Sequence, residues 1–298
     1  MNMDRLDCLE TLVHVIESGS FSAAARRLGA SQPTVSKRVA HLEETLGATL
    51  FLRTTRQLSP TEEARRIYDQ ARIILETYDG ALAVARNARP EPAGTLVVSV
   101  PSSLGRHMLM PVVSEFMRLH PQVSLDMRLS ERQVNLVEEG VELALRIGDL
   151  GDSTLRARAL GRVRRYAVAS PKYLHKRPTP RDPGELDEHV CIGYSRFGSP
   201  SNWVFEGENG RHVVNVECRI KLDDADTLQA AVLDGLGIAI LPNWLVQPKL
   251  ATGELEIVLA EHTVPSLPLS AIYPDPGPLS LRAREFLRLL VERKGLLG

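Results

Sequence analysis

The chain has 298 residues, which is long enough for more than one domain. Its 36 Lys and Arg residues nearly balance its 37 Asp and Glu residues, so the overall charge gives no sign of a nucleic-acid partner. The three cysteines, Cys8, Cys191 and Cys218, are far apart, form no metal or redox motif and favour a reducing compartment. The acidic N-terminus does not resemble a signal peptide, and no apolar run approaches the roughly 20 residues of a membrane helix. We therefore expect a cytoplasmic protein with no membrane partner.

The stretch 20–46 predicts two short amphipathic helices with a tight break between them. Ser20 is placed to cap the first helix, over about 21–28, and Gly29 is placed to end it. Ser31 is placed to cap the second helix, with Pro33 in the first turn, where a missing N–H costs nothing. Apolar residues recur along the second helix at helical spacing and predict one buried stripe: Val35, Val39, Leu42 and Leu46.

The opposite face of the second helix is polar and mildly basic. Two helices joined by a tight turn, with such a face on the second, form the helix-turn-helix pattern, which presents donors and acceptors to base edges in the major groove. Residues 21–60 hold six basic side chains against Glu43 and Glu44, a local excess that the total charge hides. The side chains predicted to bind DNA from this helix are Ser31, Gln32, Pro33, Thr34, Ser36, Lys37, Arg38 and His41.

The segment 48–60 predicts a short wing hairpin. An apolar cluster at 50–52 anchors its base, and Arg53 and Arg56 make its tip basic. Two arginines on a loop are usually only solvated charges. Beside a helix-turn-helix, contact of Arg53 and Arg56 with phosphates or the minor groove is the better interpretation.

From Thr61, which is placed to cap it, the sequence predicts one long helix over 61–88, about 42 Å in length. Its apolar positions alternate in steps of four and three: Ala64, Tyr68, Ala71, Leu75, Tyr78, Leu82 and Ala85. Such a stripe either packs on its own domain or pairs with the same helix of a second chain. Because the helix is long and ends in a polar segment, 87–94, we favour dimerisation.

From residue 95 onward, strand-like and helix-like stretches alternate, which predicts an α/β fold with a mostly parallel sheet and helices on both faces. The strand-like runs are 95–100, 123–129, 142–147, 164–169, 190–194, 237–241 and 268–273. The helical stretches are 105–119, 132–139, 227–236, 244–252 and 281–294. About 205 residues are enough for two lobes of this kind.

The sequence shows no catalytic constellation. Residues 193–197 approach a nucleophile elbow, but Phe197 stands where the second glycine should be. Gly235 and Gly237 begin a dinucleotide-binding fingerprint, but Ile240 occupies the position of the third glycine. The eight histidines are scattered without zinc-protease spacing. We therefore expect no enzyme activity, no metal and no cofactor.

A ligand site is predicted from topology, because ligands of open parallel sheets bind beyond the carboxyl ends of the strands. The residues at these ends in the first lobe, and those expected to face them from the second, are Ser102, Ser103, Ser130, Arg146, Tyr194 and Thr227. Hydroxyls, a helix start and one guanidinium favour a small organic anion.

Each of these positions also has an ordinary structural explanation. The serines would serve equally well as helix caps, and Arg146 could pair with Asp149 or Asp152. An acidic cluster at 223–226 opposes an anion, so a zwitterion or a neutral ligand stays open.

The run FSAAARRLGASQPTVSKRVAHLEETLGATLF, at 21–51, strongly resembles the DNA-binding region of LysR-type transcriptional regulators. The later motifs VSVPSSLGRHMLMPVVSEF, ELALRIG, YAVASPKYL and LQAAVLDGLGIAILP extend the resemblance along the chain. Two positions depart from the family: Ala64 stands where relatives commonly have Gly, and 223–226 is acidic where relatives often have neutral Asn.

The resemblance implies a winged helix-turn-helix over 1–60, a linker helix over 61–90 and a two-lobed domain similar to periplasmic binding proteins over 91–298. The expected lobes are about 91–162 with 267–298, and 163–266. It further implies a regulator that binds operator DNA as a homodimer or homotetramer, takes a small-molecule effector between its lobes and contacts RNA polymerase. The rivals are a solute-binding protein and a two-lobed cytosolic enzyme, which the DNA-binding motif and the missing catalytic set oppose.

Overall fold

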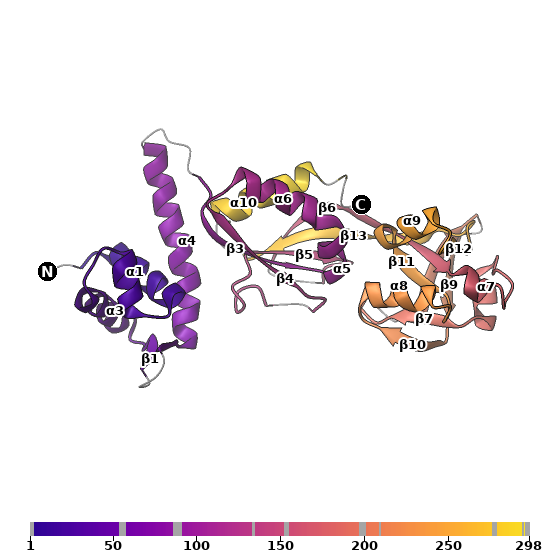
Figure 1. Ribbon diagram of the computed structural model, residues 1–298, viewed down its shortest axis with the longest axis horizontal. Helices are drawn as coiled ribbons and strands as arrows, with labels where there is room; N and C mark the ends of the chain where they lie inside the picture. The colour runs from indigo at the N-terminus through magenta and orange to yellow at the C-terminus, as the bar shows by residue number, and fades with distance from the viewer. Residues whose placement is uncertain are drawn as a thin grey trace.

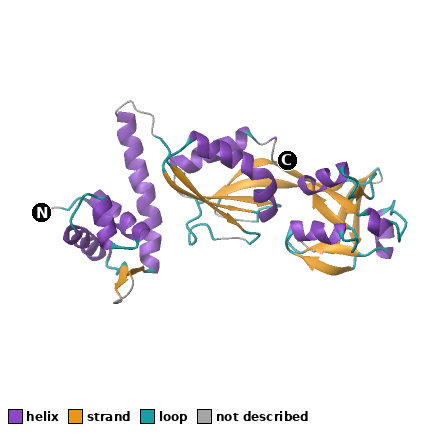
Figure 2. Cartoon of the chain, in the orientation of Figure 1, coloured by secondary structure: helices purple, strands orange, loops and turns teal. Residues whose placement is uncertain are grey.

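The computed structural model describes residues 3–53, 58–85, 91–132, 135–151, 155–196, 201–208, 210–275, 279–293 and 295. The molecule is elongated, with a helical N-terminal domain, a long helix and two sheet-containing lobes in a row (Figure 1). Helices dominate the N-terminal part, and strands form the middle of both lobes (Figure 2). No helix in the described ranges combines the length and the apolar character needed to cross a membrane.

Local caps set the boundaries of the N-terminal helices, α1 (Arg5–Ser18), α2 (Phe21–Arg27) and α3 (Gln32–Leu46). The hydroxyl of Ser20 accepts the N–H of Ala23, and that of Ser31 accepts the N–H of Thr34. Gly47 ends α3 in the left-handed conformation, with φ of 65°. The wing strands, β1 (Phe51–Arg53) and β2 (Leu58–Pro60), pair antiparallel as predicted, and the loop between them lies outside the described residues.

The core of the N-terminal domain follows most of the predicted stripe. Val35, Val39 and Leu42 are buried, whereas Leu46 is 43% exposed, so the prediction for Leu46 was wrong. Leu46 is the last residue of α3, and the helix ends at Gly47 directly after it.

Helix α4 (Glu62–Ala85) follows the wing, and Thr61 caps it by accepting the N–H of Ala64. Ala64 and Ala71 are fully buried, and the hydroxyl of Tyr68 donates to Glu17 of α1 over 3.2 Å. The first half of the predicted stripe therefore packs on its own domain. Beyond it, Tyr78 is 46% exposed, so the second half offers apolar surface.

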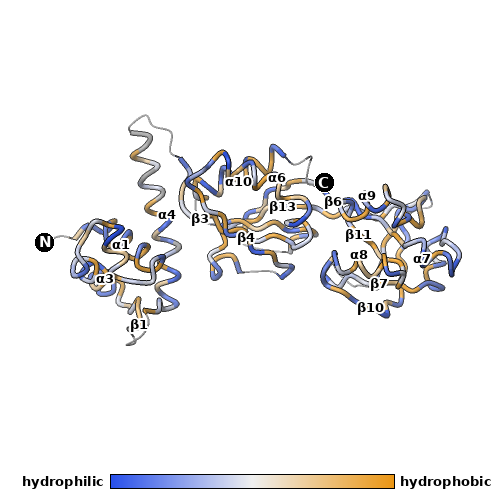
Figure 3. Tube along the Cα trace, viewed as in Figure 1, coloured by the Kyte–Doolittle hydropathy of each residue, from blue (hydrophilic) through white to orange (hydrophobic). Residues whose placement is uncertain are grey.

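The first lobe contains three parallel strands, β3 (Gly94–Val100), β4 (Val123–Leu129) and β5 (Leu143–Ile147). A turn of helix, α5 (Ser102–Leu104), follows β3 and continues through η1 (Gly105–Leu109) into α6 (Met110–Leu119). Helix α10 (Leu281–Glu292) lies beside α6, and the rings of Phe116 and Phe286 meet edge to face with centroids 4.9 Å apart. Hydrophobic residues gather along the strands, as Figure 3 shows.

Two long strands, β6 (Arg156–Ala169) and β13 (Val264–Tyr273), run antiparallel through both lobes. They make one sheet of order β11-β6-β13-β5-β3-β4, so the predicted mostly parallel sheet is correct for β4-β3-β5 and wrong for these connecting strands. The predicted helix over 132–139 is also wrong, since residues 136–140 form a turn. The remaining elements, all in the second lobe, are α7 (Pro171–Leu174), η2 (Pro183–Glu188), β7 (Cys191–Tyr194), β8 (Asn202–Gly207), β9 (Gly210–Asn215), β10 (Cys218–Leu222), α8 (Ala225–Leu233), β11 (Ala239–Pro242), α9 (Asn243–Ala251) and β12 (Glu256–Ile257).

Candidate functional site: a recognition helix and an interlobe cleft

The first two turns of α3 present a polar surface. Gln32, Pro33, Thr34 and Lys37 are exposed, and Ser36 and His41 are partly exposed. The Gln32 side chain is held near α2, because its Oε1 accepts the hydroxyl of Ser22 over 3.1 Å. The predicted contact set therefore lies largely on one side of α3, opposite the buried stripe.

One of the predicted DNA-binding residues of α3 is turned away from this surface. Arg38 is turned toward α1, where its guanidinium pairs with the Asp7 carboxylate and only 20% of its side chain is exposed. Its position therefore differs from the prediction, because a carboxylate 31 residues away in sequence draws it inward. Arg56 and the side chain of Arg53 lie outside the described residues.

A cleft of about 1050 Å³ separates the two lobes, a volume suited to a small organic ligand. Four of the six residues predicted for effector binding line it: Ser103, Ser130, Arg146 and Tyr194. The other two are not among the lining residues. The N–H and hydroxyl of Thr227 both donate to Asp224, which caps α8, so Thr227 serves the helix end instead.

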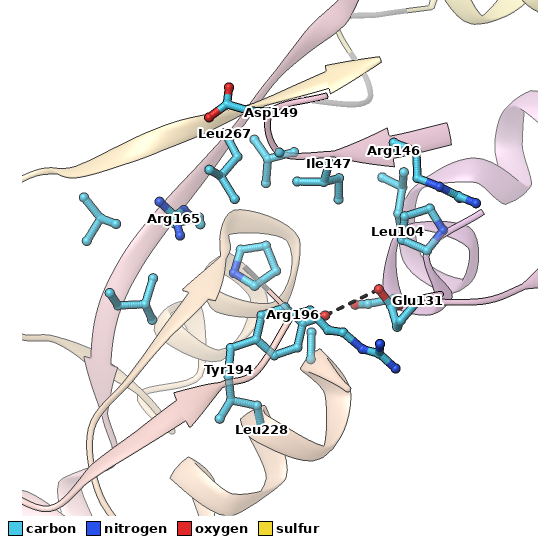
Figure 4. A pocket seen from close by; sticks show the side chains of 18 of the residues that line it. Leu104, Glu131, Arg146, Ile147, Asp149, Arg165, Tyr194, Arg196, Leu228 and Leu267 are labelled. Atoms are coloured by element: carbon cyan, nitrogen blue, oxygen red, sulfur yellow. Dashed lines mark hydrogen bonds between the residues drawn. The ribbon is translucent and has the colours of Figure 1, made fainter. Parts of the chain in front are cut away.

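The backbone of Ser102 contributes even though its side chain does not line the cleft. Its N–H donates to Oε1 of Glu131 over 2.7 Å, at the start of α5. The Glu131 carboxylate also accepts the Tyr194 hydroxyl from the other lobe over 3.5 Å (Figure 4). Burial raises the pKa of Glu131, and burial followed by the charge of Glu131 raises the pKa of Tyr194. The chain thus places its own carboxylate where the sequence suggested an anionic ligand.

Ser103 and Trp244 join the lobes in the buried part of the cleft. The indole Nε1–H of Trp244, on α9, donates to the Ser103 hydroxyl over 3.0 Å, and both residues are less than 10% exposed. A buried donor that lost this acceptor would cost free energy, so the contact favours the observed spacing of the lobes.

Arg146 is held by the first lobe. Its Nη1 donates to the carbonyl of Leu145 over 2.7 Å, and its Nη2 donates to the Ser99 hydroxyl over 3.2 Å. Burial is the main cause that lowers the pKa of Arg146, and the nearby carboxylate of Glu131 acts in the opposite direction.

The acidic cluster at 223–226 is locally compensated. Asp223 pairs with Arg196 over 3.1 Å, and Asp224 is the α8 cap. Asp226 reaches across to the first lobe, where its carboxylate lies 2.7 Å from Arg106 and 2.6 Å from His107. These carboxylates therefore weigh less against an anionic ligand than the sequence suggested.

Sequence reasoning missed several cleft residues that carry charge, and one that donates a hydrogen bond across the cleft: Glu131, Asp149, Arg165, Arg196, Arg211 and Trp244. Glu131 directly follows the predicted Ser130 at a strand end, so the same topological rule could have included it. Nothing local in the sequence marks Arg165 or Trp244, whose positions depend on strand and helix packing.

The described residues do not suggest catalytic or metal chemistry. They hold no group of three or more His, Cys, Asp or Glu side chains placed to bind a metal ion. Cys8 and Cys191 are buried free thiols, and burial raises the pKa of Cys191 to about 12, which disfavours the reactive thiolate.

Two family models match the chain. Residues 6–65 match "Bacterial regulatory helix-turn-helix protein, lysR family", and residues 89–295 match "LysR substrate binding domain". Together they cover the α3 surface and the interlobe cleft.

Relatives match almost from end to end. The chain is 38% identical to the HTH-type transcriptional regulator CrgA of Neisseria meningitidis over 96% of both chains. It is 33% identical to PtxR of Pseudomonas aeruginosa over 99% of this chain and 95% of that one.

Solved structures agree with the fold. The structure of CrgA, a LysR-type transcriptional regulator, superposes with a TM-score of 0.62 at 37% identity over 99% of each chain. Full-length AphB of Vibrio cholerae gives 0.61 at 26% identity over 97% of this chain and 99% of that one. The chain therefore belongs to the LysR family of DNA-binding transcriptional regulators, with an N-terminal winged helix-turn-helix and a two-lobed effector-binding domain.

Proposed function

We propose that this regulator reads its operator with the N-terminal half of α3, through Gln32, Ser36 and Lys37. The observation that carries the proposal is the exposed polar surface of α3 opposite its buried stripe. A helix of this kind enters the major groove with its first turns toward the base edges. Ser31, Pro33, Thr34 and His41 flank the same surface, and the wing arginines Arg53 and Arg56 are proposed to contact the backbone.

A gel-shift titration tests the DNA-binding function directly. The full chain is mixed with the DNA that flanks its own coding region and with an unrelated fragment of the same length. We expect a complex with the first at a concentration at least tenfold lower than with the second. Equal affinity for both fragments would contradict sequence-specific regulation.

Gln32→Ala is expected to relax operator preference, because a good bidentate side-chain contact to a base contributes about 1–3 kcal/mol of discrimination. Competition between operator and single-base variants would measure that discrimination. Thr45→Ala, an exposed change near the other end of α3, is the control and should discriminate like the parent chain. Unchanged discrimination by Gln32→Ala would remove Gln32 from the proposed contact set.

For the effector domain, we propose that a small molecule binds in the interlobe cleft and changes the relative placement of the lobes. The supporting observations are the cleft volume and the contacts that cross it from Ser103, Glu131 and Asp226. A ligand that binds one lobe spacing better than another shifts the population toward that spacing.

The proposed organisation is a DNA-binding domain at 1–60, a linker helix at 61–90 and an effector domain at 91–298. Within the effector domain, one lobe comprises about 91–162 with 267–298, and the other comprises 163–266. We propose that the protein acts in the cytoplasm, as a homodimer or homotetramer, and that effector binding alters its contact with promoter DNA or RNA polymerase.

Leu75→Glu is expected to dissociate the dimer proposed along the second half of α4. Leu75 belongs to the heptad stripe beyond the part that packs on the DNA-binding domain, and Tyr78, one turn further on, is 46% exposed. A carboxylate placed in an apolar interface costs several kcal/mol. Sedimentation velocity would measure the oligomer.

Thr77→Glu is the control, because Thr77 is exposed and lies off the stripe. It should leave the oligomer unchanged. If Leu75→Glu also leaves it unchanged, the interface lies elsewhere.

A further inference from the structure

Arg165 lies on β6, the strand that runs from one lobe to the other, and its side chain lines the cleft (Figure 4). Its Nε and Nη2 donate to the carbonyl oxygen of Pro265, over 3.2 and 2.6 Å. A guanidinium has more N–H donors than one carbonyl oxygen can accept, so its Nη1 edge is left for another acceptor.

Three other arginines line the cleft within the described ranges, and Arg165 differs from each of them. Arg211 is exposed, so water can solvate its charge. Arg196 pairs with Asp223, and Arg146 lies in the field of Glu131 and donates to acceptors of its own lobe. Within the described ranges, Arg165 forms no ion pair with a carboxylate. Asp149 also lines the cleft but is exposed and forms no ion pair with it.

The surroundings of Arg165 make its charge poorly solvated. Burial alone lowers the pKa of Arg165 to about 10, with no opposing effect from a carboxylate. Charged groups removed from water are normally paired with an opposite charge. An unpaired charge in a concave site therefore favours binding of a ligand of opposite charge.

The walls beside Arg165 are aliphatic. Ile147 of β5, Ile240 of β11 and Leu267 of β13 all line the cleft. An inorganic anion would gain nothing from these side chains, whereas an organic acid would bury its hydrocarbon part against them.

We propose that Arg165 binds the carboxylate of the effector, and that the effector is a small organic acid whose apolar body lies against these aliphatic walls. This inference rests on the proposed function of the cleft and specifies its ligand class. It places the anion beside β6 and away from the start of α5, where the Glu131 carboxylate already accepts the N–H of Ser102. The planar guanidinium matches a carboxylate through paired N–H donors.

The test measures binding of matched acids and amides to the full-length protein by calorimetry. The probes are acetate, hexanoate and benzoate, each beside its neutral amide. We expect hexanoate or benzoate to bind, acetate to bind at least tenfold more weakly, and none of the amides to bind comparably. Comparable binding of an acid and its amide would overturn the proposal, as would binding of none of the acids.

Arg165→Gln is expected to weaken binding of the favoured acid at least tenfold. Arg164→Gln is the matched control, since Arg164 is the exposed neighbour whose side chain alternates to the other side of the strand. Arg165→Lys keeps the positive charge but loses the paired N–H donors of the guanidinium, so it should give an intermediate affinity. Full affinity in Arg165→Gln would overturn the assignment.

Two readouts separate this inference from the function on which it rests. Operator binding without effector should be unchanged in Arg165→Gln. A circular-dichroism melting curve that matches the parent chain would show that the effector domain of the variant is folded. If only a neutral or cationic compound binds, and Tyr194→Phe weakens it, the cleft remains an effector site and the carboxylate assignment fails. If Tyr194→Phe and Arg165→Gln both leave every ligand's affinity unchanged, the cleft itself is not the site.

Discussion

Replacing Glu142 with alanine is expected to lower the free energy of unfolding by about 3–5 kcal/mol, because it leaves a buried guanidinium without its carboxylate. The Nη2 of Arg282, on α10, donates to Glu142 Oε1 over 2.9 Å, and only 3% of the Arg282 side chain is exposed. Burial, with the nearby charge of Arg72 as a second cause, lowers the pKa of Arg282 to about 9. Urea denaturation of the full chain would measure the change.

The same carboxylate also contributes to the contact between α4 and the effector domain. Arg72, on α4, donates to the carbonyl of Thr95 at the start of β3 over 2.6 Å, and its guanidinium lies 3.6 Å from Glu142. We therefore expect Glu142→Ala to loosen α4 as well as α10. Faster hydrogen exchange at the start of β3 would report this.

Glu138→Ala is the control for this prediction, because Glu138 is an exposed residue of a nearby turn and forms no ion pair within the described residues. Its expected effect is within about 0.5 kcal/mol, as for most surface changes. If Glu142→Ala costs as little as Glu138→Ala, the Arg282 charge must be compensated by its other acceptors, such as the carbonyl of Thr95.

The helix boundaries of the N-terminal domain could be predicted because their causes are local. Ser20 caps α2 and Ser31 caps α3, each by accepting an N–H three residues ahead. Gly47 takes the left-handed conformation at the end of α3. A cap visible within four residues needs no knowledge of the rest of the fold. By the same rule, Asp224 could have been recognised as the cap that takes the hydroxyl of Thr227 away from the cleft.

The contacts that the sequence could not give are those between distant segments. Arg38 turns inward because Asp7, on another helix, lies beside it, and no spacing rule links these two positions. The first half of β6 carries arginines at 156, 158 and 162, which hide a strand that pairs with β13, about a hundred residues later.

The cleft shows the same limit at the level of one residue. Arg164 and Arg165 are equivalent in sequence, and only one of them lines the interlobe cleft. Alternate side chains of β6 point to opposite faces of the sheet, so only one of the two arginines can face the cleft. The register of β6, in which Arg165 pairs with Val264 and Pro242, decides that it is Arg165. The topological rule led to the sheet edge where the cleft lies, but it could not choose between neighbouring arginines.

Leu50→Ala is expected to remove DNA binding by unfolding the DNA-binding domain, while the effector domain stays folded. Leu50 is fully buried, its N–H donates to Glu43 of α3 over 2.7 Å, and its carbonyl accepts the N–H of Thr61 over 2.9 Å. It therefore joins the end of α3 to the start of α4. Removing a buried leucine side chain costs about 2–5 kcal/mol.

A domain of about 60 residues has only about 3–9 kcal/mol of stability, so this loss is a large part of the total. Circular dichroism should show that the DNA-binding domain melts at a lower temperature than in the parent chain. Gel shifts at 37 °C should show no operator complex. Leu52→Ala is the control: Leu52 is 57% exposed, and its truncation should change neither measurement. If Leu50→Ala binds operator like Leu52→Ala at 37 °C, the core around Leu50 is less important to the recognition helix than its burial indicates.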